Sequence, residues 1–146
     1  MRIPSFLACV LGFTLLAVGF STVRAQQPRS VLDGVYTDAQ AKRGDKVFAD
    51  NCATCHGPAL KGTDTAGPPL TGPDFINGWK GMSVGALLSK ISGDMPSKAP
   101  GTLTPEQYAD VLAFVLSVSK YPAGQTELPT DAVALKPVRM AAAPRS

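Results

Sequence analysis

Apolar residues recur at helical spacing near the middle of the chain. Ala41, Gly44, Phe48 and Cys52 follow one another at intervals of three or four residues, which places them on one face of a helix. Thr37 suits the N-cap of that helix, because a threonine side chain can accept a hydrogen bond from a free N–H group of the first turn. Glycine destabilises a helix interior by about 1 kcal/mol relative to alanine, so Gly44 on the apolar face indicates a close approach by another helix.

Two further helices are predicted in the second half of the chain. The shorter one runs from a Ser83 N-cap to about Ile91. The longer one begins after Thr104, has a proline in its first position and ends at about Ser119. Its apolar positions form a broad face, which consists of Tyr108, Val111, Leu112, Phe114, Val115 and Val118.

Residues 57–82 show no regular periodicity, because glycine–proline pairs interrupt them repeatedly. A loop of this length inside a compact domain usually wraps around something. Phe75 and Trp79 are its large apolar side chains, and both could simply be packed in the core. Three helices and no convincing strand predict a small all-α domain, whose own core is too small to make it very stable.

The two ends of the chain differ in composition from the helical part. Residues 1–25 have the features of a secretory signal peptide, with an early arginine, an apolar stretch and small residues before a cleavage site near Ala25. The apolar stretch is shorter than the about 20 residues that a spanning helix needs, and a retained membrane anchor is the alternative. We expect a lead-in over 26–36, a domain over 37–130 and a disordered tail over 131–146.

The net charge of the chain gives little information about its binding partners. The full chain has 14 Lys and Arg against 11 Asp and Glu, a formal net charge of +3. Removal of the signal peptide would delete Arg2 and Arg24 and no acid, which leaves 12 basic against 11 acidic residues and a charge of +1. There is no basic cluster, so nucleic-acid binding is not expected. Export by the signal peptide predicts a periplasmic protein, and we expect no stable membrane span after its cleavage.

The chemistry of the chain is concentrated in the sequence Cys52-Ala53-Thr54-Cys55-His56. Cys-x-x-Cys-His is the attachment motif of c-type haem. Two cysteines three residues apart project from the same face of a helical turn, so each thiol can form a thioether with one haem vinyl group. The adjacent histidine can then reach the iron. The predicted cofactor is one covalent haem c with its iron, attached through Cys52 and Cys55 and ligated by His56.

Other uses of the cysteine pair fit less well. A structural zinc site normally takes four protein ligands, whereas the chain has one histidine and one further cysteine, Cys9, which signal cleavage would remove. A thioredoxin-like pair would be expected in a βαβ context. A disulfide across so short a loop would be strained and would leave His56 without a role.

The iron of such a haem needs a sixth ligand or an open position. Because the chain has no second histidine, the candidates are Met82, Met95, Met140, a lysine or water. Met95 follows a predicted helix and is held in an extended conformation by Pro96. Met82 precedes a helix cap, and Met140 falls in the expected disordered tail. A methionine could instead be ordinary core packing.

These residues together resemble class I cytochromes c. The resemblance rests on residues 52–57 (Cys-Ala-Thr-Cys-His-Gly), residues 67–72 (Gly-Pro-Pro-Leu-Thr-Gly), Met95-Pro96 and the aromatic C-terminal helix. Val35-Tyr36-Thr37 and Asn77-Gly78-Trp79 are similar to bacterial monohaem cytochromes that accompany quinoprotein dehydrogenases. The implied fold is the small cytochrome c fold, in which a few helices and long loops wrap around one haem.

The resemblance also implies roles for individual residues. His56 would be the proximal ligand of the iron and Met95 the distal ligand. The carbonyl of Pro68 would accept the other imidazole N–H, which fixes the tautomer and raises the basicity of the ligand. Leu70 would pack on the haem, and Trp79 could donate its indole N–H to a buried propionate.

A haem with two protein ligands implies an electron carrier and not an enzyme. We expect a periplasmic one-electron shuttle that accepts electrons from a dehydrogenase, with a quinoprotein as the favoured donor. Its acceptor would be an oxidase or another cytochrome of the respiratory chain. One alternative is a non-catalytic subunit of a dehydrogenase complex. The other is a peroxidase or gas-binding protein, which would need an open distal position on the iron.

Overall fold

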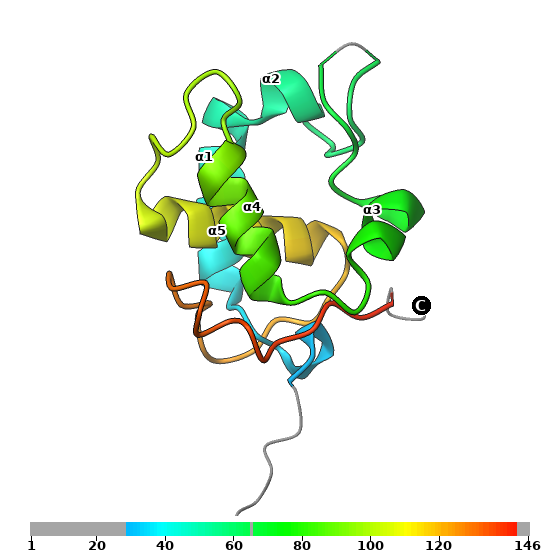
Figure 1. The fold of residues 1–146 in the computed structure, drawn as a ribbon, viewed down its shortest axis with the longest axis vertical. Coiled ribbons are helices and arrows are strands. Elements are labelled where there is room, and N and C mark those ends of the chain that lie inside the picture. The colour runs from blue at the N-terminus through cyan, green and yellow to red at the C-terminus, as the bar shows by residue number, and fades with distance from the viewer. Residues whose placement is uncertain (1–28, 65, 143–146) are drawn as a thin grey trace, which may run out of the picture.

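The computed structural model describes residues 29–64 and 66–142, and the predicted signal peptide lies outside them. Within these residues the protein is all-α, as predicted, and strand pairing is limited to isolated bridges (Figure 1). The 3-10 turn η1 (Val31–Asp33) precedes five α-helices: α1 (Asp38–Asn51), α2 (Ala53–His56), α3 (Gly72–Trp79), α4 (Val84–Asp94) and α5 (Pro105–Val118).

The three helices predicted from the apolar pattern correspond to α1, α4 and α5. Each begins where the sequence indicated, because the side chains of Thr37, Ser83 and Thr104 accept hydrogen bonds from first-turn N–H groups at 3.1, 3.0 and 3.2 Å. The cap of α5 is reciprocal, since Thr104 N donates to Gln107 Oε1 at 2.8 Å. Local side-chain chemistry thus fixes the start of each long helix.

The other two helices, α2 and α3, follow α1 in the chain, and apolar periodicity did not indicate them. α2 has only 4 residues, which is too short for periodicity to reveal. α3 begins at Gly72-Pro73, although the glycine–proline pairs indicated only breaks in structure. Proline is also favoured in the first turn of a helix, because the N–H group that it lacks would have no helical partner there.

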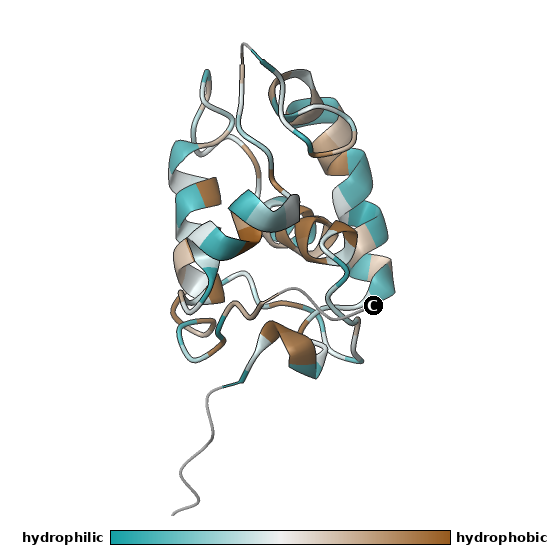
Figure 2. Cartoon of the chain, turned by 90° about the vertical axis from the view of Figure 1, so that its right-hand side faces the viewer, coloured by the Kyte–Doolittle hydropathy of each residue, from teal (hydrophilic) through white to brown (hydrophobic). Residues whose placement is uncertain are grey.

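The core is organised by the crossing of α1 and α5. A Cβ atom on Gly44 would lie 1.8 Å from the Asp110 carbonyl oxygen, so only glycine allows the two helices to come this close. The rings of Phe48 and Phe114 pack beside this point with their centroids 5.4 Å apart. Leu112 in the middle of α5 is 0 % exposed, and apolar residues gather towards the inside of the molecule (Figure 2).

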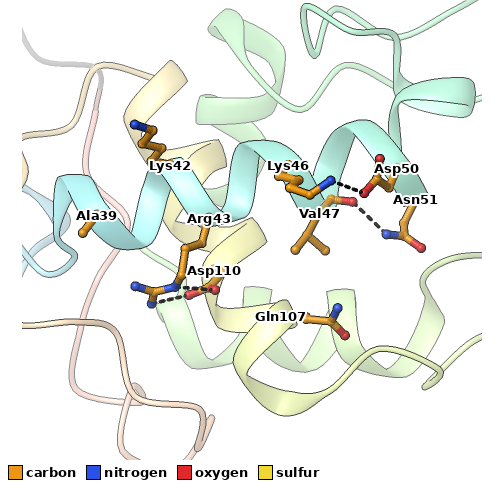
Figure 3. Close-up of a pocket in the computed structure, with 9 residues that line it drawn as sticks. All are labelled: Ala39, Lys42, Arg43, Lys46, Val47, Asp50, Asn51, Gln107 and Asp110. Atoms are coloured by element: carbon orange, nitrogen blue, oxygen red, sulfur yellow. Dashed lines mark hydrogen bonds and ion pairs between the residues drawn. The ribbon is translucent and has the colours of Figure 1, made fainter.

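Ion pairs between Arg43 and two carboxylates stabilise the outer side of this crossing. The Arg43 guanidinium donates to both carboxylate oxygens of Asp110 at 2.8 and 2.9 Å (Figure 3) and to both of Glu127 at 2.9 and 3.0 Å. The hydrogen bonds from Arg43 lower the pKa of the Glu127 carboxyl. Asp110 is nearly buried whereas Glu127 is half exposed, so the Asp110 pair is the less screened of the two.

The C-terminal part of the described chain, residues 120–142, packs against the helices, and we call it the C-terminal strap (orange to red in Figure 1). This corrects the expectation that the tail from residue 131 is disordered, as far as residue 142. The expectation came from composition alone, which does not show whether scattered apolar residues find a surface to cover. The apolar residues that the strap buries are Tyr121, Leu128, Leu135, Val138 and Met140.

Backbone hydrogen bonds join the strap to the N-terminal segment and to α4. Arg139 N donates to Arg29 O at 2.8 Å. Val84 N donates to Val138 O at 2.8 Å. This second bond satisfies an N–H group in the first turn of α4, which no carbonyl of the helix itself can reach. The strap therefore fixes the end of α4 that lies farthest from Met95.

Two features of the helices accommodate the strap. The buried amide of Gln40 accepts from Leu128 N at 2.8 Å and donates to Leu128 O at 3.1 Å, so one side chain pairs with both backbone polar groups of this strap residue. A Cβ atom on Gly85 would lie 2.2 Å from the Ala132 carbonyl oxygen, so the strap can lie against α4 only because this residue is glycine. Both contacts are long-range and leave no periodic signal in the sequence.

We predict that Gly44→Ala lowers the free energy of unfolding of the haem-loaded protein by about 1–3 kcal/mol or more, because the added methyl group overpacks the crossing of α1 and α5. Gly93→Ala is the matched control, since this α4 glycine has nothing within 4 Å of its Cβ position. Gly93→Ala should leave the free energy of unfolding unchanged or raise it by up to about 1 kcal/mol, because alanine is favoured over glycine inside a helix. Urea denaturation followed by circular dichroism measures both, and equal effects would contradict the close crossing.

We predict that Leu135→Ala lowers the free energy of unfolding by about 2–5 kcal/mol, because it leaves a cavity under the strap. Val133→Ala, two residues away, should change it by less than about 0.5 kcal/mol, since Val133 is 61 % exposed and Leu135 only 2 %. Thermal and urea unfolding of both variants provide the measurement. A disordered tail would instead make the two substitutions equally neutral.

Candidate functional site

A cavity of about 840 Å³ opens between α1, α2, α3, α4 and α5. Its volume falls in the range of roughly 300–1,000 Å³ that is usual for ligand and cofactor sites. Much of its wall is apolar and comes from buried core residues such as Phe48, Val111 and Val115. The cavity brings together every site residue predicted from the sequence: Cys52, Cys55, His56, Pro68, Leu70, Trp79 and Met95.

A single helical turn presents the two cysteines to this cavity. Cys52 ends α1 and begins α2, and its carbonyl accepts hydrogen bonds from Cys55 N at 3.1 Å and His56 N at 3.0 Å. Both thiols are free and both residues line the cavity. Burial, and to a smaller degree the neighbouring Cys55, raises the pKa of the Cys52 thiol. The predicted spacing therefore has the geometry that attachment of one ligand at two points requires.

The imidazole of His56 is held in one orientation by the loop that follows. His56 is 7 % exposed, and its Nδ1 lies 2.8 Å from the carbonyl oxygen of Pro68. Since a carbonyl oxygen can only accept, Nδ1 is the nitrogen that carries the proton in the neutral imidazole, and the lone pair of that tautomer is on Nε2. This is the tautomer that a metal ligand needs. The distance between the two atoms agrees with the role that the resemblance implied for Pro68.

The loop that carries Pro68 is folded back onto α2 by its own hydrogen bonds. Gly62 N donates to His56 O at 2.8 Å, and Thr63 Oγ1 donates to Cys55 O at 2.9 Å. Gly67 lies directly beside the histidine, and a Cβ atom there would approach both His56 Nδ1 and Cys55 O to 3.0 Å. The close contact between the loop and the histidine explains why a glycine precedes Pro68.

The structure separates the three candidate methionines. Met82 and Met95 line the cavity, whereas Met140 is 2 % exposed and packs in the strap outside the cavity wall. Met82 is 45 % exposed. The backbone of each is held by two hydrogen bonds: Met82 N donates to Trp79 O and Met82 O accepts from Met140 N, both at 2.9 Å, whereas Met95 N donates to Ile91 O at 3.0 Å and Met95 O accepts from the Tyr108 hydroxyl at 2.7 Å. The two residues differ in burial, because Met95 is half-buried and Met82 is exposed.

Two residues of α3 contribute to the wall on the side away from α2. Trp79 and Phe75 both line the cavity, and Phe75 is 7 % exposed. The sequence left open whether these residues are core or cofactor contacts, and here Phe75 is a core residue whereas Trp79 is partly buried and packs against the core. The hydrogen bond from the Trp79 indole to a haem propionate stays a prediction.

One contact at the site was not expected from the sequence. Tyr108 was read as part of the apolar face of the last helix, and its ring is indeed buried at 4 % exposure. Its hydroxyl, however, reaches the carbonyl of Met95. The sequence indicated only that one hydroxyl lies on a helix face whose other side chains are hydrocarbons. It does not identify the hydrogen-bond partner of that hydroxyl.

Comparison with known families now identifies the domain. Residues 39–115 match the family described as "Cytochrome C oxidase, cbb3-type, subunit III". The match covers more than half of the chain, and the chain belongs to this family of cytochrome c domains. It includes the Cys-x-x-Cys-His motif, the loop that carries Pro68, Met95 and most of α5.

Individual relatives agree with this assignment. The chain is 35% identical over 80 residues to the Cbb3-type cytochrome c oxidase subunit CcoP of Rubrivivax gelatinosus, which is 54% of this chain and 26% of that protein. It is 29% identical over 89 residues to cytochrome c1 of Rhodobacter capsulatus, which is 58% of this chain and 31% of that protein. The match thus spans about a quarter to a third of these relatives. The sulfane dehydrogenase SoxCD of Paracoccus pantotrophus gives a TM-score of 0.49 at 22% identity, over 73% of this chain and 60% of that one.

Membership of the family means that the chain carries covalent haem c, and the residues present fit that group. A Cys-x-x-Cys-His turn, a histidine with free Nε2 and a largely apolar wall surround one cavity. Cytochrome c domains are typically electron carriers and lie outside the cytoplasm. Among the described residues, no helix has the length and apolar character required to cross a membrane.

Proposed function

We propose that this chain is a periplasmic one-electron carrier with one haem c, whose axial ligands are His56 and Met95. The observation that supports the proposal best is the joint placement of Cys52, Cys55, His56 and Met95 around one cavity, in which Met95 is half-buried. The donor in this proposal is a dehydrogenase, with a quinoprotein as the first candidate. The acceptor is an oxidase or another cytochrome of the respiratory chain.

The bound haem would supply the exchange of one electron between ferric and ferrous iron. His56 would hold the iron from one side through Nε2. The hydrogen bond from Nδ1 to Pro68 O at 2.8 Å prevents the imidazole from rotating and makes it a stronger donor.

Met95 would hold the iron from the other side through its sulfur. A thioether is a soft ligand that favours the ferrous state, and it therefore raises the reduction potential. The apolar residues Phe48, Val111 and Val115 act in the same direction, since a low-dielectric wall disfavours the extra positive charge of the ferric state. With both ligands on residues whose backbones are held, the protein would rearrange little when an electron is transferred.

A second candidate function follows from the relatives. CcoP is named as an oxidase subunit, and both curated relatives are longer than the part that matches this chain. This chain could accordingly serve as a docked, non-catalytic subunit of a larger redox complex. An open-site peroxidase or gas-binding role is disfavoured, because Met95 lines the cavity in which such an enzyme would need a free position.

We predict that Met95→Ala removes the Fe(III)–thioether charge-transfer band, lowers the potential and allows carbon monoxide to bind the ferrous protein. Met82→Ala should leave all three properties unchanged, although Met82 also lines the cavity. Both variants should keep covalent haem on a denaturing gel. Absorption spectra with a carbon monoxide titration provide the measurement, and the reverse pattern would make Met82 the ligand.

We predict that the mature protein elutes as a small free haem protein when it is extracted from its own membrane and periplasmic fractions at about 150 mM salt. At that ionic strength, charge pairs on the surface between this protein and a partner are largely screened. Gel filtration followed by haem staining gives the measurement. Elution of all the haem with a larger complex, unchanged at higher salt, would instead support the docked subunit.

A further inference from the structure

The peptide groups on both sides of Met95 are held by different helices. On the N-terminal side, Met95 N donates to Ile91 O at 3.0 Å and so continues the hydrogen-bond pattern of α4. On the C-terminal side, the Met95 carbonyl accepts from the Tyr108 hydroxyl of α5 at 2.7 Å. The second bond joins residues that are 13 positions apart in the sequence.

The segment that follows Met95 has little else to hold it. Residues 97–102 are exposed. The hydrogen bonds recorded for residues 96–103 are local, from Ala99 N to Pro96 O and from Thr102 Oγ1 to Ala99 O, both at 2.8 Å. Exposed segments with few buried contacts open at low free-energy cost. Leu103 at the end of this segment packs against the core, and the Tyr108 hydroxyl supplies the hydrogen bond that ties the start of the segment to α5.

Tyr108 itself is rigidly placed. It lies in the first turn of α5 and is 4 % exposed, and its N–H donates to Thr104 O at 3.1 Å. The reciprocal cap between Thr104 and Gln107 fixes that turn. The rest of α5 is fixed by its close crossing with α1 at Gly44. The hydroxyl therefore reaches the Met95 carbonyl from a helix that is held at its cap and at its crossing with α1.

We propose that Tyr108 is a positioning residue that controls how often Met95 leaves the iron. The inference rests on the proposed ligation by Met95. Movement of the Met95 backbone away from the cavity would displace its carbonyl and break the bond to the Tyr108 hydroxyl. The bond therefore stabilises the ligated arrangement over the open one, and its removal raises the population of the open form that can accept an external ligand.

The chain provides a matched control for the loss of a tyrosine hydroxyl. Tyr36 is 2 % exposed, and its hydroxyl donates to the Tyr121 carbonyl at 2.6 Å. This bond has the same chemistry as that of Tyr108 but joins the N-terminal segment to the strap, and Tyr36 does not line the cavity. Tyr36→Phe and Tyr108→Phe should therefore lower the thermal midpoint of the holoprotein to a similar extent.

The test is an imidazole titration of the ferric holoprotein, because imidazole binds the iron only when Met95 has left it. The apparent affinity is the intrinsic affinity multiplied by the open fraction. Tyr108→Phe should tighten imidazole binding about two- to tenfold, the range that corresponds to one neutral hydrogen bond. Tyr36→Phe should leave it at the wild-type value. Tyr108→Leu provides a second variant that lacks the hydroxyl, with the same direction expected.

The outcomes separate this inference from the proposed ligation. If the wild type shows the thioether band and Tyr108→Phe binds imidazole no more tightly than Tyr36→Phe does, the positioning role is overturned while the ligation by Met95 stands. If the wild type shows no thioether band, both proposals are overturned. Tighter binding by both Tyr108 variants, with unchanged binding by Tyr36→Phe, would support the positioning role against a general loss of stability.

Discussion

The close crossing of α1 and α5 is the contact on which the rest of the structure depends. It is possible because Gly44 has no side chain, so the backbone of α5 at Asp110 can lie against α1. The end of α1 then carries Cys52 to the rim of the cavity, and α5 presents Val111 to its wall. A shift of one helix against the other would move the attachment points of the cofactor relative to the wall that surrounds it.

The two proposed iron ligands are supported in different ways. The proximal side is local, since the loop that positions His56 follows it directly in the chain and the cysteines lie in the same turn. The distal side is assembled from three elements, because Met95 follows α4, its carbonyl is held by Tyr108 of α5, and the strap anchors the opposite end of α4. An electron carrier benefits from this arrangement, since two ligands that stay in place keep the rearrangement on electron transfer small.

The C-terminal strap lies beyond the part of the chain that matches the family, which ends at residue 115. It adds buried apolar surface to a domain that has a small core of its own. It also supplies a partner for Val84 N at the start of α4, and the Gln40 amide of α1 in turn satisfies the backbone N–H and C=O of Leu128 in the strap. The strap thus extends the common cytochrome c core and stabilises the elements that frame the cavity.

The sequence by itself determined what depends on short-range order. The caps at Thr37 and Thr104 and the spacing of Cys52, Cys55 and His56 act within one helical turn, so the helices and the haem motif could be predicted. The order of the strap beyond residue 130 and the hydroxyl contact to Met95 were decided only by the tertiary structure. Those contacts join groups that meet only in the folded chain, and neither periodicity nor composition indicates which partner a non-repeating segment or a single hydroxyl will have.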